Sequence, residues 1–433
     1  MLGRAPNRST RARSPQRGAG VAAPARTTPR SKTKFVLGSV NINGAGSEET
    51  HHKWSDLIST MRTNRIGIMV VQETHLTHAR TSRLRTTYNK NVILHNSSEI
   101  FNENSKGVAV LINRLEVKCT KDDIDTYEIV AGRAIMVSVP WRTPTGKLHI
   151  LGVYAPNDPE QNEVFWNQIL AAFAAHPAWP APDFMAGDLN MVENPRDREP
   201  PSACRAATAA ALRTLLDRYH LVDGWRKENP GMTRYTWRSR ATTGPHVGNR
   251  SRIDRIYIRD ALWDDSRDWG IQVDHPISTD HELIQASLYD IEAPYIGKGR
   301  WEVPSFLLKH DKFLEVLDDI CSSAVTDAKS HNDAGRAQTI LEELKTRIRD
   351  RARSIAKESV PKTRKKINEL KKKLEEEFDD EALTPEERNE RTDALSEEIK
   401  QLEHAQLDKR RADTATKWML ESETIGRTWI RAN

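Results

Sequence analysis

Cysteine is scarce in this chain. Only three occur in 433 residues, at Cys119, Cys204 and Cys321. They are odd in number and form no metal-type spacing, which is typical of a protein in a reducing compartment. The chain also lacks an apolar run of 18 residues and anything that resembles a secretory signal, so we expect no membrane partner.

Acidic residues are absent from the first 34 residues. This stretch holds nine lysines and arginines, in a chain whose net charge is only +5. A segment rich in Arg, Pro, Ser and Ala cannot bury a core, so we predict a disordered basic tail over residues 1–33. The tail could bind nucleic acid, act as a nuclear localisation signal or serve as a transit peptide. Its prolines argue against the amphipathic helix of a transit peptide.

Short apolar runs of β type dominate the middle of the chain. The runs expected to be strands are 34–40, 66–71, 92–94, 108–112, 134–139, 148–154, 184–187, 235–237, 251–258 and 283–288. Only a few helical segments lie between them, at 54–61, 163–173 and 206–216. Many runs follow one another directly, which favours mainly antiparallel sheets. We therefore predict one α/β (α+β) domain over residues 34–291, with two sheets packed face to face and helices outside.

The composition becomes helical and highly charged beyond residue 297. We predict a linker over 292–303 and a helical extension over 304–433. Two narrow apolar stripes lie in the extension, at Ile367, Leu370, Leu374 and Phe378 and at Leu395, Ile399, Leu402 and Ala405. They favour a coiled-coil hairpin, which also offers a surface for self-association, and the alternative is a pair of solvated charged helices. Thr384 and Pro385 are typical of a helix start between the stripes.

One predicted strand ends in an acid and an amide. The run 184–187 closes at Gly187, where we expect the chain to turn out of the sheet. Asp188 and Asn190 are two residues apart and would point the same way on an extended backbone. A carboxylate binds a cation or takes a proton, while a carboxamide orients a partner without adding charge. The alternative is an Asx turn that only caps the strand.

Similar side chains follow the other predicted strands. Those at or just past strand ends are Asn41, Glu73, Tyr154 with Asn157, Asp188 with Asn190, Asp254, and Asp280 with His281. Oxygen donors without thiols suit a hard cation such as Mg²⁺ or Mn²⁺. Ordinary alternatives exist for each: a satisfied histidine at His281, an ion pair between Asp254 and a neighbouring arginine, and a core role for Tyr154.

These side chains belong to six motifs in a fixed order. The motifs are Asn-Ile-Asn-Gly at 41–44, Gln-Glu-Thr-His at 72–75, Tyr-Ala-Pro-Asn at 154–157, Gly-Asp-Leu-Asn at 187–190, Arg-Ile-Asp-Arg-Ile at 252–256 and Thr-Asp-His-Glu at 279–282. The set resembles the endonuclease/exonuclease/phosphatase superfamily, the fold of deoxyribonuclease I and of exonuclease III-type abasic-site endonucleases. The first three motifs look like the endonuclease domain of non-LTR (LINE-type) retrotransposons, as do Gly299-Arg300-Trp301 and Lys417-Trp418. In that family a reverse transcriptase follows, and this chain has no Tyr-x-Asp-Asp signature.

The resemblance implies a four-layer sandwich of two similar β-sheets with the site at one mouth. It makes Glu73 the main Mg²⁺ ligand, helped by Asn41, and places Asp280 near the metal. A divalent ion held by a carboxylate keeps several waters that a phosphate can displace.

The resemblance also assigns the remaining side chains. His281 matches the family's histidine, and Asp254 matches the carboxylate that fixes its tautomer. Asp188 and Asn190 would position and help to deprotonate the attacking water. Tyr154 and Asn157 would contact the phosphate.

The implied reaction is hydrolysis of one DNA phosphodiester by in-line attack, which leaves a 3′-hydroxyl and a 5′-phosphate. The implied role is nicking of target DNA by a LINE-type element in the nucleus, with DNA as partner and element RNA or a missing reverse transcriptase as further partners. Two other functions stay open: an abasic-site repair endonuclease or phosphatase of the same superfamily, and an inactive nucleic-acid-binding relic.

A basic stretch over 238–250 lies between two strands that lead to the site. We expect a hairpin loop that enters a DNA groove, with Arg238, Arg240 and Arg250 on phosphates. The alternative is a solvated loop.

Overall fold

The computed structural model describes residues 34–44, 52–99, 106–241, 243, 247–272, 275–290, 303, 307, 310–330, 334–358, 362–379, 387 and 390–405. The predicted tail over 1–33, most of the predicted linker and the helix start at Thr384 lie outside these residues. So do the motifs at 299–301 and 417–418. No helix in the described part of the chain combines the length and the apolar character that a bilayer crossing requires.

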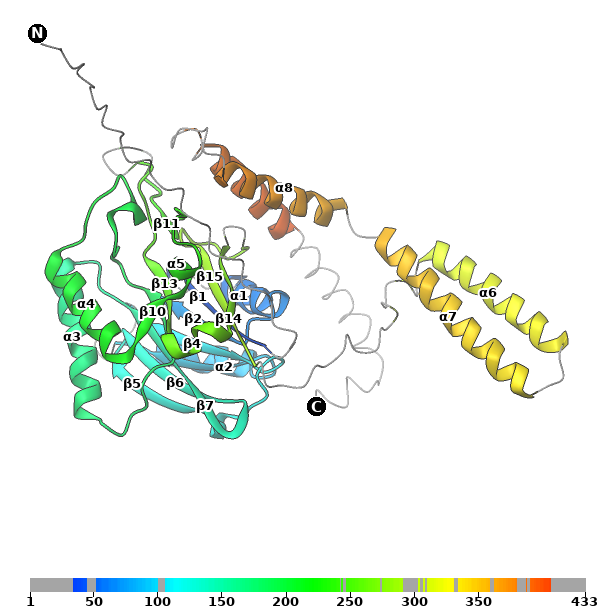
Figure 1. The fold of residues 1–433 in the computed structure, drawn as a ribbon, viewed down its shortest axis with the longest axis horizontal. Helices are drawn as coiled ribbons and strands as arrows, with labels where there is room; N and C mark the ends of the chain where they lie inside the picture. The colour runs from blue at the N-terminus through cyan, green and yellow to red at the C-terminus, as the bar shows by residue number, and fades with distance from the viewer. Residues whose placement is uncertain are drawn as a thin grey trace, which may run out of the picture.

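Two six-stranded sheets form the centre of residues 34–290 (Figure 1). The first has the order β14(Ser266–Gln272), β15(Leu283–Tyr289), β1(Lys34–Asn41), β2(Ile68–Gln72), β4(Val108–Asn113) and β3(Val92–Ser97). The second has the order β10(Leu221–Asp223), β13(Asp254–Arg259), β8(Phe184–Asp188), β7(Thr143–Tyr154), β6(Ala134–Trp141) and β5(Asp125–Val130). Neighbours are antiparallel except for the pairs β1–β2 and β7–β8. The prediction of mainly antiparallel sheets is confirmed.

The two sheets pack face to face over one apolar core. That core joins Leu37 and Val70 of the first sheet to Val137, Phe184 and Ile256 of the second. Because strand side chains alternate between faces, the opposite faces of both sheets are also apolar and need a cover.

Helices supply this cover on both sides. Trp54 and Leu57 of α1(His52–Thr63) pack on the outer face of the first sheet. The second sheet is covered by α3(Pro159–Ala175) and α4(Ala206–Tyr219), through residues such as Phe165 and Leu212. The result is the predicted four-layer α/β sandwich.

Several elements were not expected from the sequence. One is β9(Arg198–Glu199), which forms a small sheet with β11(Trp237–Arg238) and β12(Arg250–Ser251) at the predicted strands 235–237 and 251–258. The others are α2(His78–Thr87), α5(Gly224–Glu228) and the strands β5, β10 and β14. They carry few apolar residues or are very short, so their hydrophobic period is weak. In α2 the start is fixed instead by a cap, because the Thr77 side chain accepts a hydrogen bond from the backbone N–H of Arg80.

The C-terminal region contains two pairs of packed helices. α6(Asp311–Ser330) meets α7(Ala334–Glu358) around Phe313 and Ile355. α8(Lys362–Asp379) meets the helix over 390–405 through Ile367, Leu374 and Ile399. The two predicted stripes therefore meet through these residues with Leu370, Leu395 and Leu402, whereas Ala405 is exposed and the side chain of Phe378 lies outside the described part. A coiled-coil supercoil and self-association stay predictions.

Gly187 does not mark the turn that we expected. β8 continues through Asp188, and Gly187 pairs with Arg255 on one side and Val153 on the other. Its φ is 154°, and a Cβ there would lie 1.9 Å from the carbonyl oxygen of Val153. Glycine is required because the neighbouring strand approaches closely.

We predict that Gly187→Ala lowers the free energy of unfolding by about 1–3 kcal/mol or more, because the methyl group meets backbone that cannot move aside. The measurement is urea unfolding followed by tryptophan fluorescence. Gly231→Ala is the matched control, since nothing lies within 4 Å of its Cβ position. Equal midpoints for the two variants would contradict this explanation.

Candidate active site

Strand ends converge at one mouth of the sandwich. In each parallel pair the two strands end at the same edge, which brings Asn41 beside Gln72 and Tyr154 beside Asp188. Asp254 begins β13 directly opposite Asp188. The sheets therefore bring residues from five distant motifs to one edge.

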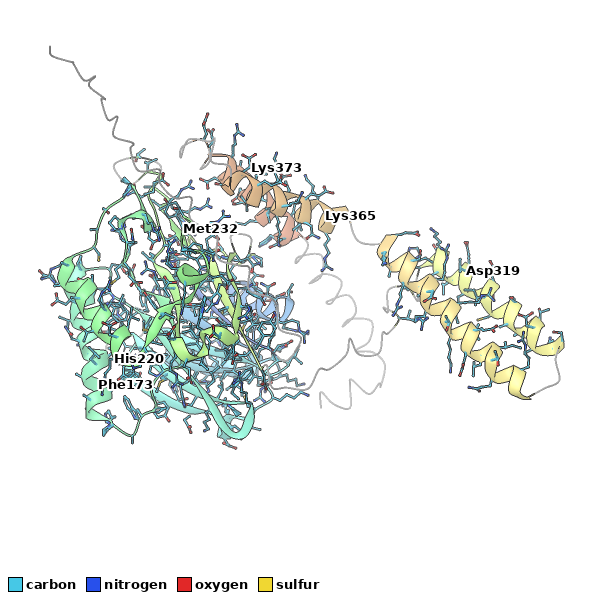
Figure 2. The ribbon with its side chains drawn as sticks, viewed as in Figure 1. Phe173, His220, Met232, Asp319, Lys365 and Lys373 are labelled. Atoms are coloured by element: carbon cyan, nitrogen blue, oxygen red, sulfur yellow. The ribbon has the colours of Figure 1, made fainter. Side chains whose placement is uncertain are left out.

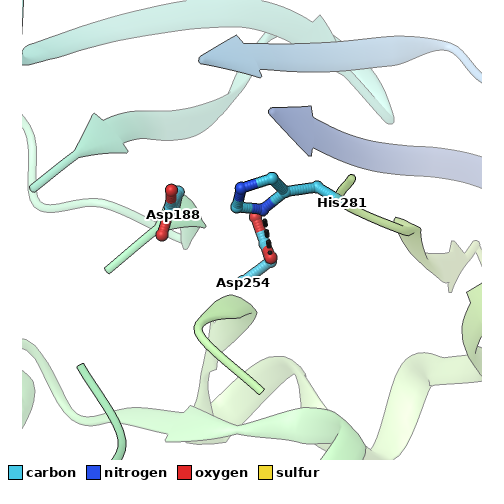
Figure 3. Close-up of side chains that lie close together, drawn as sticks. All are labelled: Asp188, Asp254 and His281. Carbon is cyan, nitrogen blue, oxygen red and sulfur yellow. Dashed lines mark hydrogen bonds and ion pairs between the residues drawn. The ribbon is translucent and has the colours of Figure 1, made fainter. Parts of the chain in front are cut away.

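A buried acid–imidazole cluster lies at the centre of this mouth (Figure 3). The Nδ1 of His281 is 2.9 Å from Oδ2 of Asp254. The donor atoms of Asp188, Asp254 and His281 all lie within 4.8 Å of one another, and all three residues are buried. His281 is thus a buried histidine whose Nδ1 is satisfied by Asp254, with a second carboxylate, that of Asp188, close by.

The charges in this cluster shift one another. Burial lowers the pKa of His281, but the negative charges of Asp254, Asp188 and Asp280 outweigh it and raise the pKa to about 10. Burial and the charge of Asp254 raise the pKa of Asp188 to about 7. At neutral pH the imidazole is therefore protonated, and Asp188 is poised to exchange a proton.

Asn41 links the cluster to Glu73. Its Nδ2 donates hydrogen bonds to Oε1 of Glu73, at 2.8 Å, and to Oδ2 of Asp188, at 2.9 Å. Its Oδ1 accepts from the backbone N–H of Asn43. In this arrangement the amide nitrogen of Asn41 faces the two carboxylates, as expected for a donor between two anions.

The side chain of Tyr154 also interacts with Glu73. Burial raises the pKa of its phenol, and the negative charges of Glu73 and Asp188 raise it further. The phenol therefore stays neutral and forms a hydrogen bond with Glu73. The guanidinium of Arg133 lies 4.6 Å from the centre of the Tyr154 ring.

Asp280 is held at the rim. Nδ2 of Asn43 donates to its Oδ1 at 3.0 Å, and Nε1 of Trp237 donates to its Oδ2 at 3.2 Å. Burial raises its pKa, but the charge of His281, the hydrogen bond from Asn43 and the charge of Arg240 outweigh burial, so that the pKa lies below its usual value. Asp280 is therefore a carboxylate at neutral pH.

Asp188 and Asn190 form the Asx turn that was the alternative interpretation. The Asn190 backbone N–H donates to Oδ1 of Asp188 at 2.9 Å, and the Asn190 side chain donates to the carbonyl of Ala155. The premise of an extended backbone was wrong, because Asn190 has φ of 52°. Asp188 nevertheless faces the cluster through its second oxygen. Asn157 lies nearby on the chain and is exposed before α3.

Backbone strain gathers around the same mouth. Asn43, Glu73, His75 and Asn190 all have φ between 44° and 52°, in the left-handed region that residues other than glycine seldom adopt. Each stands just after a strand that ends at the site. Such strain is characteristic of functional sites, where the surrounding structure enforces it.

The arginines beside Asp254 do not pair with it. Arg252 forms ion pairs with Asp197 at 2.9 Å and with Asp223 at 2.7 Å, and Arg255 lies 3.4 Å from Asp197. These charges lower the pKa of Asp197 against the effect of its burial. The alternative of an ion pair between Asp254 and a neighbouring arginine is therefore wrong. The carboxylate of Asp254 pairs with His281 instead.

Sequence reasoning missed the residues that hold the cluster in place. The Thr236 hydroxyl accepts hydrogen bonds from the backbone N–H groups of Ile253, at 3.1 Å, and Asp254, at 3.0 Å. The Thr279 hydroxyl donates to the carbonyl of Asn41 at 2.7 Å. Thr279 is the first residue of the sixth motif and Thr236 lies in a predicted strand, but threonine is common in strands and carried no signal of these roles.

The acidic rim offers oxygen ligands for a cation. Among the described residues, the group of three acidic or histidine side chains close enough to hold an ion is the Asp188–Asp254–His281 cluster. Its histidine is protonated and bonded to Asp254, so it does not serve as a ligand in this state. Glu73 also presents carboxyl oxygens at this mouth, with 20% of its side chain exposed.

The basic stretch forms a hairpin, as predicted. β11 and β12 pair antiparallel, with Arg238 opposite Arg250. Arg240 lies 3.8 Å from Asp280, with 58% of its side chain exposed. Arg250 is buried and forms an ion pair with Asp393 at 2.7 Å.

Comparison with known proteins agrees with this geometry. A Xenopus laevis protein described as "Transposon TX1 uncharacterized 149 kDa protein" is 26% identical over 284 residues, which are 65% of this chain and 20% of that protein. The chain thus spans about a fifth of the length of that relative.

Two solved structures are also similar. The AP endonuclease LMAP from Leishmania major has a TM-score of 0.49 and 14% identity, covering 61% of this chain and 93% of that one. The endonuclease domain of TRAS1, a telomere-specific non-LTR retrotransposon, has a TM-score of 0.42 and 14% identity, covering 59% and 99%.

The family model described as "Endonuclease/Exonuclease/phosphatase family" matches residues 38–281. This range begins within β1, ends at His281 and contains all the converging strand ends. The superfamily to which the motifs pointed is confirmed. The chain belongs to the endonuclease/exonuclease/phosphatase family.

Proposed function

We propose that this protein is a Mg²⁺-dependent DNA endonuclease that nicks target DNA for a LINE-type retrotransposon. The observation that carries the proposal is the buried His281–Asp254 pair facing Asp188 at the converging strand ends. A protonated imidazole beside a carboxylate of raised pKa suits hydrolysis of a phosphodiester, where negative charge grows as a water is deprotonated. The similarity to a transposon protein supports the biological setting.

In the proposed reaction a water oxygen forms a bond to phosphorus while the bond from phosphorus to O3′ breaks. Asp188 accepts the proton of the water, which Asn190 helps to orient. The electron pair of the broken bond goes to O3′, which takes a proton from solvent. The products are a 3′-hydroxyl and a 5′-phosphate.

His281 stabilises the negative charge that develops on the phosphate oxygens. Asp254 keeps the imidazole protonated and holds its Nδ1, so that the opposite edge of the ring faces the substrate. Tyr154 is a neutral phenol with one O–H, which would turn from Glu73 to the phosphate when substrate binds, and Asn157 would contact the same group. Each role follows from the protonation state of the residue.

Glu73, with Asp280 and the amide oxygen of Asn41, would hold Mg²⁺ or Mn²⁺. The donor chemistry fits such a cation, because the carboxylates are charged and Asn41 has an oxygen available if its amide turns over. The ion, when bound, neutralises charge on the phosphate and its leaving oxygen.

We predict that the full chain converts supercoiled plasmid to open circles with Mg²⁺ and not with EDTA. His281→Ala should lower the nicking rate about 100-fold or more, the usual contribution of a positioned acid–base group. His220→Asn is the matched control, because His220 is exposed and left-handed at the end of α4, a conformation that asparagine tolerates.

No nicking by the folded wild-type chain, or equal rates for the two histidine variants, would overturn the proposed function. Cleavage of an abasic-site duplex with little action on intact DNA would instead identify the repair-type activity. Binding of DNA without cleavage of either substrate would identify a relic.

We predict that Asp254→Asn makes the nicking rate sensitive to alkaline pH. In the wild type His281 stays protonated up to a pKa of about 10, so the rate should not fall between pH 7 and 9. Without the Asp254 charge, burial dominates and the pKa moves down towards its ordinary value of 6.5. The variant should therefore lose activity as the pH rises above that value.

The measurement is a pH–rate profile of plasmid nicking with the wild type, Asp254→Asn and the exposed control Asp217→Asn. A profile for Asp254→Asn that is lowered by the same factor at every pH would contradict this role of Asp254.

A further inference from the structure

Two arginines of the β11–β12 hairpin hold a carboxylate from the C-terminal region. Arg238 Nη1 donates to Oδ1 of Asp393, and Arg250 Nη2 donates to Oδ2 at 2.7 Å. Each guanidinium therefore takes one of the two oxygens. Asp393 belongs to the helix over 390–405, which packs on α8. Two oxygens of one anion between two arginines are also the arrangement in which arginines bind phosphate.

In this contact the two arginine side chains are more buried than the aspartate side chain. The side chain of Arg250 is only 6% exposed and that of Arg238 is 23% exposed, whereas that of Asp393 is 45% exposed. Burial lowers the pKa of Arg250 to about 10, and the adjacent charge of Arg238 contributes. Two neighbouring guanidinium groups repel each other, so an anion between them is stabilising.

Other acidic groups near the pair are less well placed to serve both arginines. Glu282 lies 3.8 Å from Nε of Arg238, whereas Asp393 contacts Nη1 of the same guanidinium. Glu199, opposite Arg250 on β9, interacts with Arg250 through its charge. These carboxylates help to hold the guanidinium groups in place, while Asp393 bridges the two.

The arginine pair lies beside the proposed active site. The backbone N–H of Arg238 donates to the carbonyl of Asp280 at 3.2 Å. The backbones of Trp237 and His281 form an isolated antiparallel β-bridge. A cavity of about 620 Å³ separates this edge from the helix over 390–405. Its lining includes Arg238, Arg240 and Asp280 of the endonuclease domain and Asp393, Lys400 and His404 of the helix.

The hairpin of α8 and the helix over 390–405 has its own apolar core. Ile367, Leu374 and Ile399 form a cluster with other residues of the same hairpin. Its basic face is exposed: Lys365 and Lys373 project from α8 (Figure 2). The contact of Asp393 with the endonuclease domain is an ion pair that is partly open to solvent, and such pairs contribute little and weaken with salt. A competing anion can therefore displace it.

We propose that Arg238 and Arg250 form a binding site for one phosphate of the DNA backbone, which the carboxylate of Asp393 occupies in this structure. This inference rests on the proposed endonuclease function. DNA and the C-terminal hairpin then compete for the same two guanidinium groups. When the phosphate binds, Asp393 leaves, and the cavity beside Asp280 opens to the rest of the duplex.

The test is the affinity of the full chain for a fluorescent duplex, measured by anisotropy in EDTA so that no cleavage occurs. Asp393→Asn should tighten binding roughly fivefold, the upper range of a partly exposed ion pair. The slope of log K against log salt should become more negative, because salt weakens the competing ion pair of Asp393 in the wild type and the variant has no such pair. Glu390→Gln is the matched control, since it removes one negative charge from an exposed position of the same helix.

A second variant identifies the site of competition. In an Arg238→Gln background the gain from Asp393→Asn should disappear, because the phosphate has lost one of its two ligands. A gain that persists in this background would show that Asp393 acts elsewhere and would overturn the proposal. So would binding by Asp393→Asn that equals that of Glu390→Gln, or that is weaker than that of the wild type.

Plasmid nicking by the wild type distinguishes failure of the proposed competition from failure of the proposed endonuclease function. If the wild type nicks DNA and Asp393→Asn behaves like the control, the competition is wrong and the endonuclease stands. If the wild type neither binds the duplex nor nicks plasmid, both the proposed function and this inference fail.

Discussion

The ion pair between His281 and Asp254 is the interaction on which the rest of the site depends. Both residues are buried, and a buried charge is costly unless an opposite charge and hydrogen bonds compensate for it. The pair also acts on Asp188, whose pKa is raised first by burial and then by the charge of Asp254, while the charge of His281 lowers it in part. The two neighbouring aspartates therefore differ: Asp254 is hydrogen-bonded to the imidazole, and Asp188 has a raised pKa.

The packing of the two sheets holds Asp188, Asp254 and His281 close together. The site joins β8, β13 and the segment before β15, which come from both sheets, so the facing core between the sheets fixes their separation. Thr236 fastens the backbone at Asp254, and the Asp197–arginine network fixes the residues on either side. Asp254 is therefore held rigidly while its carboxylate remains available to His281, as a preorganised electrostatic site requires.

Much of this could be predicted from the sequence. Strands such as Ile68–Gln72 and Phe184–Asp188 are buried on both faces and show as continuous apolar runs, and the motifs at their ends identified Glu73, Asp188 and His281. Local patterns could not predict that Arg252 pairs with Asp197, or that Asn190 bends back to Ala155. Those contacts depend on tertiary packing between segments that are far apart in the chain, and so does the contact of Asp393 with Arg238 and Arg250.

The most direct test of this account is the protonation of His281 in the full chain, followed by NMR of its imidazole ring in EDTA from pH 6 to pH 11. We expect an imidazolium that persists through neutral pH and loses its proton near pH 10. A ring that titrates near its ordinary value of 6.5 would show that Asp254 and Asp188 do not outweigh burial, and it would contradict the proposed charge state of the site.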